Sequence, residues 1–593
     1  MPQLTYIDTE APPPREKPRF WRAALRQVVR FRVPLLAIMA LYRFVGLSFG
    51  EMQQWDESIY ALRVQTVLQF GDVLDQSPNM LSGLYYAVHP PLYVWCSTAL
   101  VMLLGDATWV YRLTSALAAA ALVLLVYRIA RSSGTAGRAL AVAGLFAFAP
   151  LPTFFSRQGQ LDLLLALCML ASLYFAWKSV RSQRAGDTFL AGMALGAALL
   201  TKFAFALSVP ASVALSAALA PPFRRRRILR VALLMTVLSL PLWLPWFAVM
   251  TDRHGGGDLL WLFSPSLPLG ATFHGLEGST KDTGMFFYFN QLVIHLSLLL
   301  PFAAVGAWQV LRPSHGASLP HRGMLPLAAV FVTLHMAALL FMRSSFTVYL
   351  IPAVPLLFYL AAHGLAVTRR AGRSTAFAVT ASAALCLAWS LFPAGRVAVK
   401  TTLGALRRGS LPADGGTALL ALAGTAAAAL LLAWWLSRRG RLRPLLTQPL
   451  LYAMIVVLAV TTMLRIWTQH PRDYVDGADE AVATLRTLDA DRVLLVGNGD
   501  NPQLTWYLRG ADIGWIPGEE RRYERLEPHA LGAEGIRDRA ARYADTARVA
   551  MLIERDEITA GVYRSPRDVM PEDFRILHET RRYVVVGEEG LRP

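Results

Sequence analysis

The chain has 593 residues, of which 55% are hydrophobic and only 17% are charged. This composition excludes an ordinary soluble globular protein and is typical of a polytopic membrane protein. The formal net charge of +18 does not indicate nucleic-acid binding, because the arginines occur in short runs between apolar segments and are not interleaved with aromatic residues.

The N-terminal residues 1–32 are basic and precede the first long apolar run. No small-residue cleavage site follows at the usual spacing, so we expect an uncleaved first span with a cytoplasmic N-terminus. Residues 33–468 then form the predicted transmembrane domain. Thirteen segments are long and apolar enough to be candidate spans: 33–49, 111–130, 139–156, 161–178, 189–203, 204–220, 229–250, 288–311, 325–342, 348–368, 374–395, 416–437 and 448–467.

The apolar segment 91–104 is too short for a full crossing and is expected to be re-entrant or interfacial. With that assignment, the arginine-rich loops all fall on the cytoplasmic side, as the positive-inside rule requires. These loops are 131–138, 179–186, 224–230, 368–373 and 437–444, and the basic loop 396–415 is the one exception. The C-terminus is therefore predicted to lie outside.

After residue 468 the composition changes, and residues 469–593 are predicted to form a small extracytoplasmic α/β domain. Short apolar runs at 492–496, 549–553 and 583–586 are typical of strands, and 526–545 is helix-like. The segment GNGDNP at 497–502 lacks the GxGxxG spacing and is interpreted as a turn at a strand end, not as a nucleotide site. The three cysteines lie within apolar segments and indicate neither disulfides nor a metal site.

The predicted topology collects unusual polar residues on the outer face. They come from the outer loop 50–110, the outer loop 251–287 and the outer ends of several spans: Asp56, Glu57, His89, Arg157, Asp162, Lys202, Lys281, Arg343 and Tyr349. Taken singly, a Lys or Arg at a helix end snorkels to the interface and an acid pair in a loop is solvated. Because ionisable groups near hydrocarbon are costly, their convergence on one face favours a functional site.

This mixture of charges points to a definite chemistry. Carboxylates can activate an acceptor hydroxyl as a general base, or hold a divalent cation. Cations bind a phosphate and stabilise the negative charge that develops on it as it leaves. A phosphate at the outer membrane face, away from cytosolic nucleotides, indicates a lipid-linked phosphate, and sugar transfer from a polyprenyl-phosphate carrier fits these constraints.

Six motifs, in order along the chain, resemble those of the GT-C glycosyltransferases, the superfamily that holds bacterial 4-amino-4-deoxy-L-arabinose lipid A transferase and the protein O-mannosyltransferases. They are WDESIYA, HPPLYVW, YRLTSAL, SRQGQLD, GMALGAALLTKFAFAL and YLIPAVPLL. The resemblance implies a GT-C fold of about thirteen transmembrane helices followed by the outer α/β domain. His89 stands where arabinose transferases typically have a Lys, whereas a His-Pro-Pro segment is familiar in mannosyltransferases, so the donor sugar stays open.

The resemblance also implies roles for individual residues. Asp56 orients or deprotonates the acceptor, with Glu57 beside it, and Asp162 supports Asp56 or shares a divalent cation with it. The donor phosphate is assigned to His89, Lys202, Arg343, Arg157 and Lys281. Substrate contacts are assigned to Tyr60, Tyr86 and Tyr349.

The sequence therefore predicts an inverting glycosyltransferase of the bacterial inner membrane that moves a sugar from a polyprenyl-phosphate donor to a lipid A-like or cell-envelope glycan acceptor. One alternative within the class is a protein O-mannosyltransferase that acts on Ser or Thr. A transporter or flippase of lipid-linked sugar is an alternative from another class, although such proteins place charges near mid-membrane and show internal repeats. A family member that has lost catalysis and serves in assembly is a third.

Overall fold

A computed structural model describes most of the chain. The described residues are 30–53, 56–76, 90–259, 285–312, 323–340, 346–370, 372–391, 424, 427, 430–431, 448–468, 476–497, 502–508, 523–526, 528–555, 561–588 and 591. Of the predicted site residues, Tyr86, His89, Lys281 and Arg343 lie outside these ranges, as do the basic loop 396–415 and most of the expected span 416–437.

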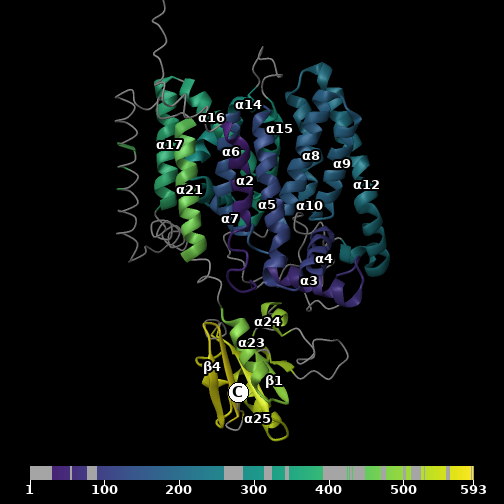
Figure 1. Cartoon of the computed structure of the whole chain (residues 1–593), viewed down its shortest axis with the longest axis vertical. Helices are drawn as coiled ribbons and strands as arrows, with labels where there is room; N and C mark the ends of the chain where they lie inside the picture. The colour runs from purple at the N-terminus through teal and green to yellow at the C-terminus, as the bar shows by residue number, and fades with distance from the viewer. Residues whose placement is uncertain are drawn as a thin grey trace, which may run out of the picture.

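The described residues up to 468 form a bundle of helices (Figure 1). Its elements are α2 (Arg32–Leu41), η1 (Tyr42–Phe44), α3 (Asp56–Phe70), α4 (Leu92–Leu104), α5 (Thr108–Arg131), α6 (Ala136–Phe148), α7 (Pro150–Phe155), α8 (Asp162–Ser182), α9 (Ala185–Leu199), α10 (Phe203–Ala206), α11 (Ser208–Ser216), η3 (Ala217–Leu219), α12 (Pro222–Leu259), α13 (Met285–Leu296), η6 (Ser297–Leu299), α14 (Leu300–Leu311), α15 (Leu325–Leu340), η8 (Thr347–Leu350), α16 (Val354–Arg370), α17 (Arg373–Leu391) and α21 (Gln448–Thr468). One large apolar core joins most of these helices.

Four helical segments among the described residues are long and apolar enough to cross a membrane: Thr108–Arg131, Asp162–Ser182, Pro222–His254 and Phe287–Leu311. Several shorter apolar helices accompany them, and the chain is a membrane protein. The segment α4 has 13 residues, which rise only about 20 Å and are too short for the hydrocarbon core of about 30 Å. The expected span 139–156 is divided into α6 and α7 at Ala149, directly before Pro150.

The helices α3 and α4 lie at one end of the bundle, next to the C-terminal domain (Figure 1). The turn after α3 reaches the C-terminal part of α12 at this same end. His254 Nε2 lies 2.7 Å from a carboxylate oxygen of Asp75, and Trp246 Nε1 donates to the Leu74 carbonyl at 3.0 Å. Asp72 and Arg253 form a second ion pair there. The two loops expected on the outer face, 50–110 and 251–287, thus meet at one end of the bundle through their described residues.

The C-terminal part contains a five-stranded sheet in the order β2-β1-β3-β5-β4. The strands are β1 (Arg492–Val496), β2 (Tyr523–Leu526), β3 (Val549–Glu554), β4 (Phe574–Glu579) and β5 (Tyr583–Glu588). β1 pairs in parallel with β2 and β3, and β5 is antiparallel to β3 and β4. The three apolar runs expected to be strands are the three central strands β1, β3 and β5.

Each face of the sheet carries its own apolar core, because successive strand residues point to opposite faces. Val493 and Leu495 pack with α23 (Ala478–Thr487) and α24 (Pro502–Tyr507). Leu494 and Val496 pack on the other face with α25 (Pro528–Ala544) and with Val569 and Met570, which follow η10 (Pro566–Asp568). In Figure 1, α23 and α24 lie between the sheet and the helical bundle.

Candidate functional site

The central residues of the candidate site lie at the ends or breaks of four separate elements. Asp56 is the first residue of α3, and Asp162 is the first residue of α8. Lys202 has an extended backbone between α9 and α10, and Tyr349 lies in η8. A residue at a helix end projects into the space beyond the helix. Segments that are far apart in sequence can therefore present their side chains to one common site.

Lys202 connects three of these elements. Its Nζ donates to a carboxylate oxygen of Asp162 at 3.2 Å, and it lies 4.6 Å from the ring centre of Tyr349. The ring of Phe205 is 5.2 Å from the same nitrogen, so aromatic faces support the ammonium group beside its carboxylate partner. The Lys202 side chain keeps 25% of its surface exposed, whereas that of Asp162 keeps 7%. One cation thus remains accessible while its counter-ion is held inside the protein.

Asp56 faces this ion pair from α3. Its side chain reaches solvent, yet protein closely surrounds it. Desolvation and the negative charge of Asp162 raise the pKa of Asp56 to about 6, against the opposing effect of Lys202. Two carboxylates that lie close together do not readily carry a negative charge at the same time. A carboxylate with a pKa near 6 is ionised at neutral pH and still basic enough to accept a proton. The arrangement therefore gives a general base beside a pair that can hold an anion.

Tyr60 lies one helical turn after Asp56, on the same face of α3. Its ring packs edge-on against Tyr93 of α4, with the ring centres 5.3 Å apart. Desolvation and the charges of Asp56 and Asp162 raise the pKa of Tyr60 well above its ordinary value. The phenol thus stays protonated, and it borders the two carboxylates as a neutral group.

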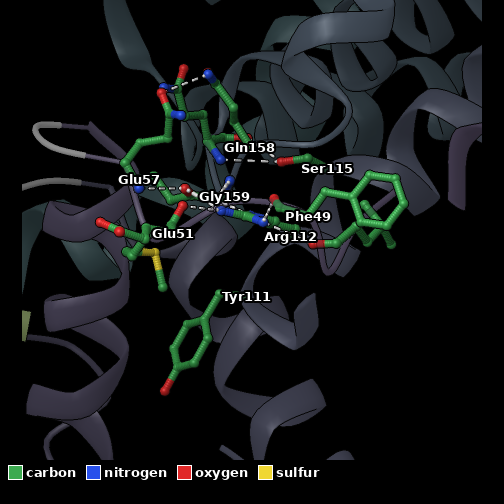
Figure 2. Close-up of polar contacts among 12 residues, drawn as sticks. Phe49, Glu51, Glu57, Tyr111, Arg112, Ser115, Gln158 and Gly159 are labelled. Atoms are coloured by element: carbon green, nitrogen blue, oxygen red, sulfur yellow. Dashed lines mark hydrogen bonds and ion pairs between the residues drawn. The ribbon is translucent and has the colours of Figure 1, made fainter. Parts of the chain in front are cut away.

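Glu57, the immediate neighbour of Asp56, is placed very differently. It is fully buried, and its two oxygens accept from Arg112 Nε at 2.7 Å and Arg112 Nη2 at 3.0 Å (Figure 2). The backbone N–H groups of Gln53 and Gly159 donate to the same carboxylate, each at 2.8 Å. With four donors around it, Glu57 has no exposed oxygen for a substrate. We therefore propose a positioning role for Glu57 in place of the expected catalytic one.

Arg112 of α5 uses its remaining N–H groups on the loop that leads to Asp56. It donates to the carbonyls of Leu47 at 2.9 Å, Phe49 at 2.8 Å and Glu51 at 2.6 Å (Figure 2). A side chain at position 159 would crowd this arrangement, because a Cβ on Gly159 would lie 3.3 Å from Glu57 Cγ. The Glu57–Arg112 pair thus ties α5 to the outer-loop segment that leads to Asp56 and to the turn that leads to Asp162. Sequence reasoning noted the motif YRLTSAL but missed this role for its arginine.

Arg157 is the second residue whose contacts favour a positioning role over the expected one. It is buried and donates to the carbonyls of Val45 at 2.7 Å, Thr153 at 2.6 Å and Tyr42 at 3.0 Å. Its guanidinium also lies 5.1 Å from the ring centre of Tyr42. These bonds hold the end of the first helical segment against α7. They leave Arg157 committed to the backbone and not to a donor phosphate.

His335 of α15 packs and hydrogen-bonds beside the site. Its Nε2 lies 2.9 Å from the Tyr349 carbonyl, and its ring stacks on Phe331 with centres 5.4 Å apart. It therefore supports the segment that brings Tyr349 to Lys202.

A metal ion would find few ligands among the described residues, where no three His, Cys, Asp or Glu side chains cluster. Asp56 and Asp162 are the two carboxylates at the site, and Lys202 already offsets the charge of Asp162. A hard divalent cation takes six or more oxygen ligands. The described donors do not by themselves form such a site.

The chain is similar to several known glycosyltransferases. Residues 88–248 match the family of dolichyl-phosphate-mannose-protein mannosyltransferases. Undecaprenyl phosphate-α-4-amino-4-deoxy-L-arabinose arabinosyl transferase from Pseudomonas aeruginosa is 30% identical over 58% of this chain and 61% of the relative. The corresponding transferase 2 from Sodalis glossinidius is 31% identical over 30% of this chain and 33% of the relative. The chain thus spans between a third and two thirds of the length of these curated relatives.

A crystal structure of ArnT from Cupriavidus metallidurans bound to undecaprenyl phosphate superposes with a TM-score of 0.58. It is 19% identical and covers 94% of this chain and 97% of that chain. The apo form of the same protein gives a TM-score of 0.57. The chain accordingly has the same helical fold as this ArnT protein. The resemblance expected from its motifs is confirmed.

Proposed function

We propose that this protein is an integral membrane glycosyltransferase that takes a sugar from a polyprenyl-phosphate donor and passes it to a lipid or glycan acceptor. The observation that carries the proposal is the convergence of Asp56 on the Asp162–Lys202 pair and Tyr349. It combines a base, an anion-binding cation and aromatic surface at one end of a helical membrane fold.

In the proposed reaction, Asp56 accepts the proton of the acceptor hydroxyl. The hydroxyl oxygen attacks the anomeric carbon of the donor sugar as the bond from that carbon to the phosphate oxygen breaks. The bonding electrons leave with the polyprenyl phosphate, and direct displacement inverts the anomeric configuration. A base with a pKa near the working pH suits this step, because it is ionised yet still basic enough to take the proton.

Lys202 binds the donor phosphate and stabilises the charge that grows on it as the bond breaks. Asp162 holds the ammonium group in place at 3.2 Å, and the exposed quarter of the lysine side chain is the part open to the phosphate. We assign His89, Arg343 and Lys281 to the same phosphate as further donors. Tyr60, Tyr86 and Tyr349 supply aromatic and hydroxyl contacts to the sugar or the acceptor.

The comparisons support the donor class. The curated relatives are named for undecaprenyl phosphate-linked aminoarabinose, and a solved structure of the same fold holds undecaprenyl phosphate. We propose the bacterial inner membrane as the location, with the N-terminus in the cytoplasm. The site and the C-terminal α/β domain, residues 469–593, then face the extracytoplasmic side. Thirteen spans satisfy this orientation.

A protein O-mannosyltransferase is the second candidate, favoured by the match of residues 88–248 to the mannosyltransferase family. It shares the donor class and the displacement chemistry and differs in the acceptor, which is a Ser or Thr hydroxyl of a polypeptide. The same assay separates the two, since the labelled product is either a lipid or glycan, or a protein.

The test uses the full chain in nanodiscs with a panel of radiolabelled polyprenyl-phosphate sugars and a crude envelope extract. We expect label to move from one carrier to an extract component with the wild type and with Asp106→Asn. Asp106 is an exposed acid of the same outer loop and serves as the matched control. Asp56→Asn should give no product. Carrier that binds but never releases its sugar would overturn the proposal in favour of transport.

A further inference from the structure

A cavity of about 680 Å³ lies at the end of the bundle opposite the candidate site. The helix α8 fixes this placement: it begins at Asp162 in the site, and its 21 residues rise about 30 Å to the end where Arg181 and Ser182 lie. The cavity is formed by the C-terminal end of α8, the C-terminal part of α11 with η3, the N-terminal end of α12 and the start of α15. Its arginines belong to the two loops expected in the cytoplasm, 179–186 and 224–230.

The cavity has an apolar floor and a basic rim. Val213, Ile228 and Leu327 line it and are buried. Arg224 and Arg227 are half-buried at its edge, and Arg181 is exposed there. Phe223, also at the edge, keeps 78% of its surface exposed. A concave surface that is apolar inside and cationic at the rim matches a molecule with an anionic head and hydrocarbon chains.

The three arginines are held in place without being neutralised. Arg227 Nη2 donates to the Ser179 carbonyl at 3.1 Å, and the guanidinium of Arg181 lies 5.3 Å from the ring centre of Trp177. Within the described ranges, none of the three forms an ion pair, and the nearby Asp187 is bonded to Lys178 at 2.8 Å. Desolvation and the adjacent positive charge of Arg224 lower the pKa of Arg227. Like charges so placed favour an anion between them.

A second, more open cavity of about 520 Å³ adjoins the first and shares Arg181. It adds Arg131 and Arg138 with the hydroxyl groups of Ser133 and Thr135. Burial and the charge of Arg370 lower the pKa of Arg138. The basic character therefore continues along this end of the bundle and is not confined to one helix.

From this arrangement we propose that the cavity rimmed by Arg181, Arg224 and Arg227 binds the phosphate headgroup of an anionic phospholipid from the leaflet opposite the active site. Guanidinium groups bind phosphate oxygens through paired N–H donors, and the buried apolar floor receives the upper part of an acyl chain. The proposal rests on this cavity alone. It does not depend on the transferase function, because no residue of the candidate site lines the cavity.

The test measures lipid binding to the purified full chain in nonionic detergent, with phosphatidylglycerol, phosphatidylcholine and inorganic phosphate as three separate probes. The pocket variant is Arg224→Gln/Arg227→Gln. The matched control is Arg226→Gln/Arg230→Gln, which removes the same charge from two exposed arginines of α12 that do not line the cavity. We expect phosphatidylglycerol to bind the wild type and the control alike, and the pocket variant at least about tenfold more weakly.

A second variant keeps every arginine and fills the cavity. Ser216→Phe places a ring into the lining and should also weaken phosphatidylglycerol binding, provided that the protein stays monodisperse on size-exclusion chromatography. Equal loss in the pocket and control variants would overturn the proposal in favour of diffuse surface attraction. So would full binding to Ser216→Phe. Equal affinity for phosphatidylcholine, or for inorganic phosphate, would overturn the assignment of the ligand to an anionic phospholipid.

Discussion

Two clusters of charge lie side by side at one end of the bundle and contrast in almost every property. The Glu57–Arg112 pair is fully buried and satisfied, with each partner hydrogen-bonded on all sides. The Asp56, Asp162 and Lys202 cluster is open at Asp56 and at part of Lys202. A buried charge whose hydrogen bonds are all made within the protein stabilises the structure. A charge that takes part in a reaction must still be able to bond to a substrate.

The difference arises within two consecutive residues. In a helix of 3.6 residues per turn, neighbours project about 100° apart, so Asp56 and Glu57 at the start of α3 face different surroundings. One points toward α8 and Lys202, and the other toward α5. Although Asp56 and Glu57 are adjacent acids in the sequence, Glu57 positions the loop and Asp56 is the proposed base.

The largest expected effect is on stability, from Glu57→Gln. Loss of this charge leaves Arg112 buried without a counter-ion, and breaking such a pair costs about 3–5 kcal/mol. We expect a large fall in unfolding temperature, measured by differential scanning fluorimetry in detergent. The double variant Glu57→Leu/Arg112→Met should not recover the loss, since the backbone groups that both side chains hydrogen-bond would lose their partners. Unchanged stability with lost transfer would instead place Glu57 in the chemistry.

Lys202→Met should weaken use of the donor with little change in unfolding temperature. A hydrogen bond to a charged group is worth about 1.5–3 kcal/mol, which corresponds to a rise of about 10- to 100-fold in the KM for the donor. Lys178→Met is the control. Lys178 lies at the end of α8 away from the site and is also paired with an aspartate, Asp187. An unaltered KM in Lys202→Met would remove this residue from the phosphate site.

The pH dependence of kcat/KM tests whether Asp56 is the base. Its pKa is raised to about 6, so the active, ionised form predominates above pH 6 and is lost about tenfold per pH unit below it. Asp162→Asn removes the repelling charge and should move the midpoint to lower pH. A rate profile with no inflection between pH 5 and 7 would contradict the assignment of Asp56 as the base.

The smallest expected effect concerns the contact between the outer loop and the C-terminal domain. The Glu51 carboxylate accepts from the N–H groups of Gly477 at 2.9 Å and Ala478 at 3.2 Å. Burial and the neighbouring Asp479 raise the pKa of Glu51 from 4.5 to about 8, so the free energy of unfolding falls as the pH rises from 4.5 to about 8 and is level above it. Glu51→Gln should match the wild type near pH 4 and should abolish the fall in unfolding temperature between pH 5 and 8. A fall that persists in Glu51→Gln would place the responsible group elsewhere.

Sequence alone was sufficient for features that are local. The motifs identified Asp56, Asp162, Lys202 and Tyr349, and the structure brings all four together. The short segment 91–104 followed from its length, and the break near Lys202 lies at the boundary between the expected spans 189–203 and 204–220. The three central strands of the sheet appeared as apolar runs, whereas the edge strands β2 and β4 did not, because their exposed sides interrupt the pattern with charges.

The sequence did not predict which group each charged side chain bonds to. Arg157 and Lys202 look alike as cations at helix ends. Arg157 is bonded to carbonyls of residues more than 100 positions away, and Lys202 stays accessible. The same holds for Arg112, whose carboxylate partner is 55 positions distant. Such pairings depend on how distant helices pack, which no local spacing reveals.

The central claim is that Asp56 takes part in the reaction and that its neighbour Glu57 does not. The most direct measurement is single-turnover transfer of labelled sugar by Asp56→Asn, with donor binding and unfolding temperature determined on the same preparation. The account predicts that transfer falls by about 10²- to 10⁴-fold while donor binding and unfolding temperature stay those of the wild type. Transfer at the wild-type rate, or a loss that merely follows a fall in unfolding temperature, would contradict it.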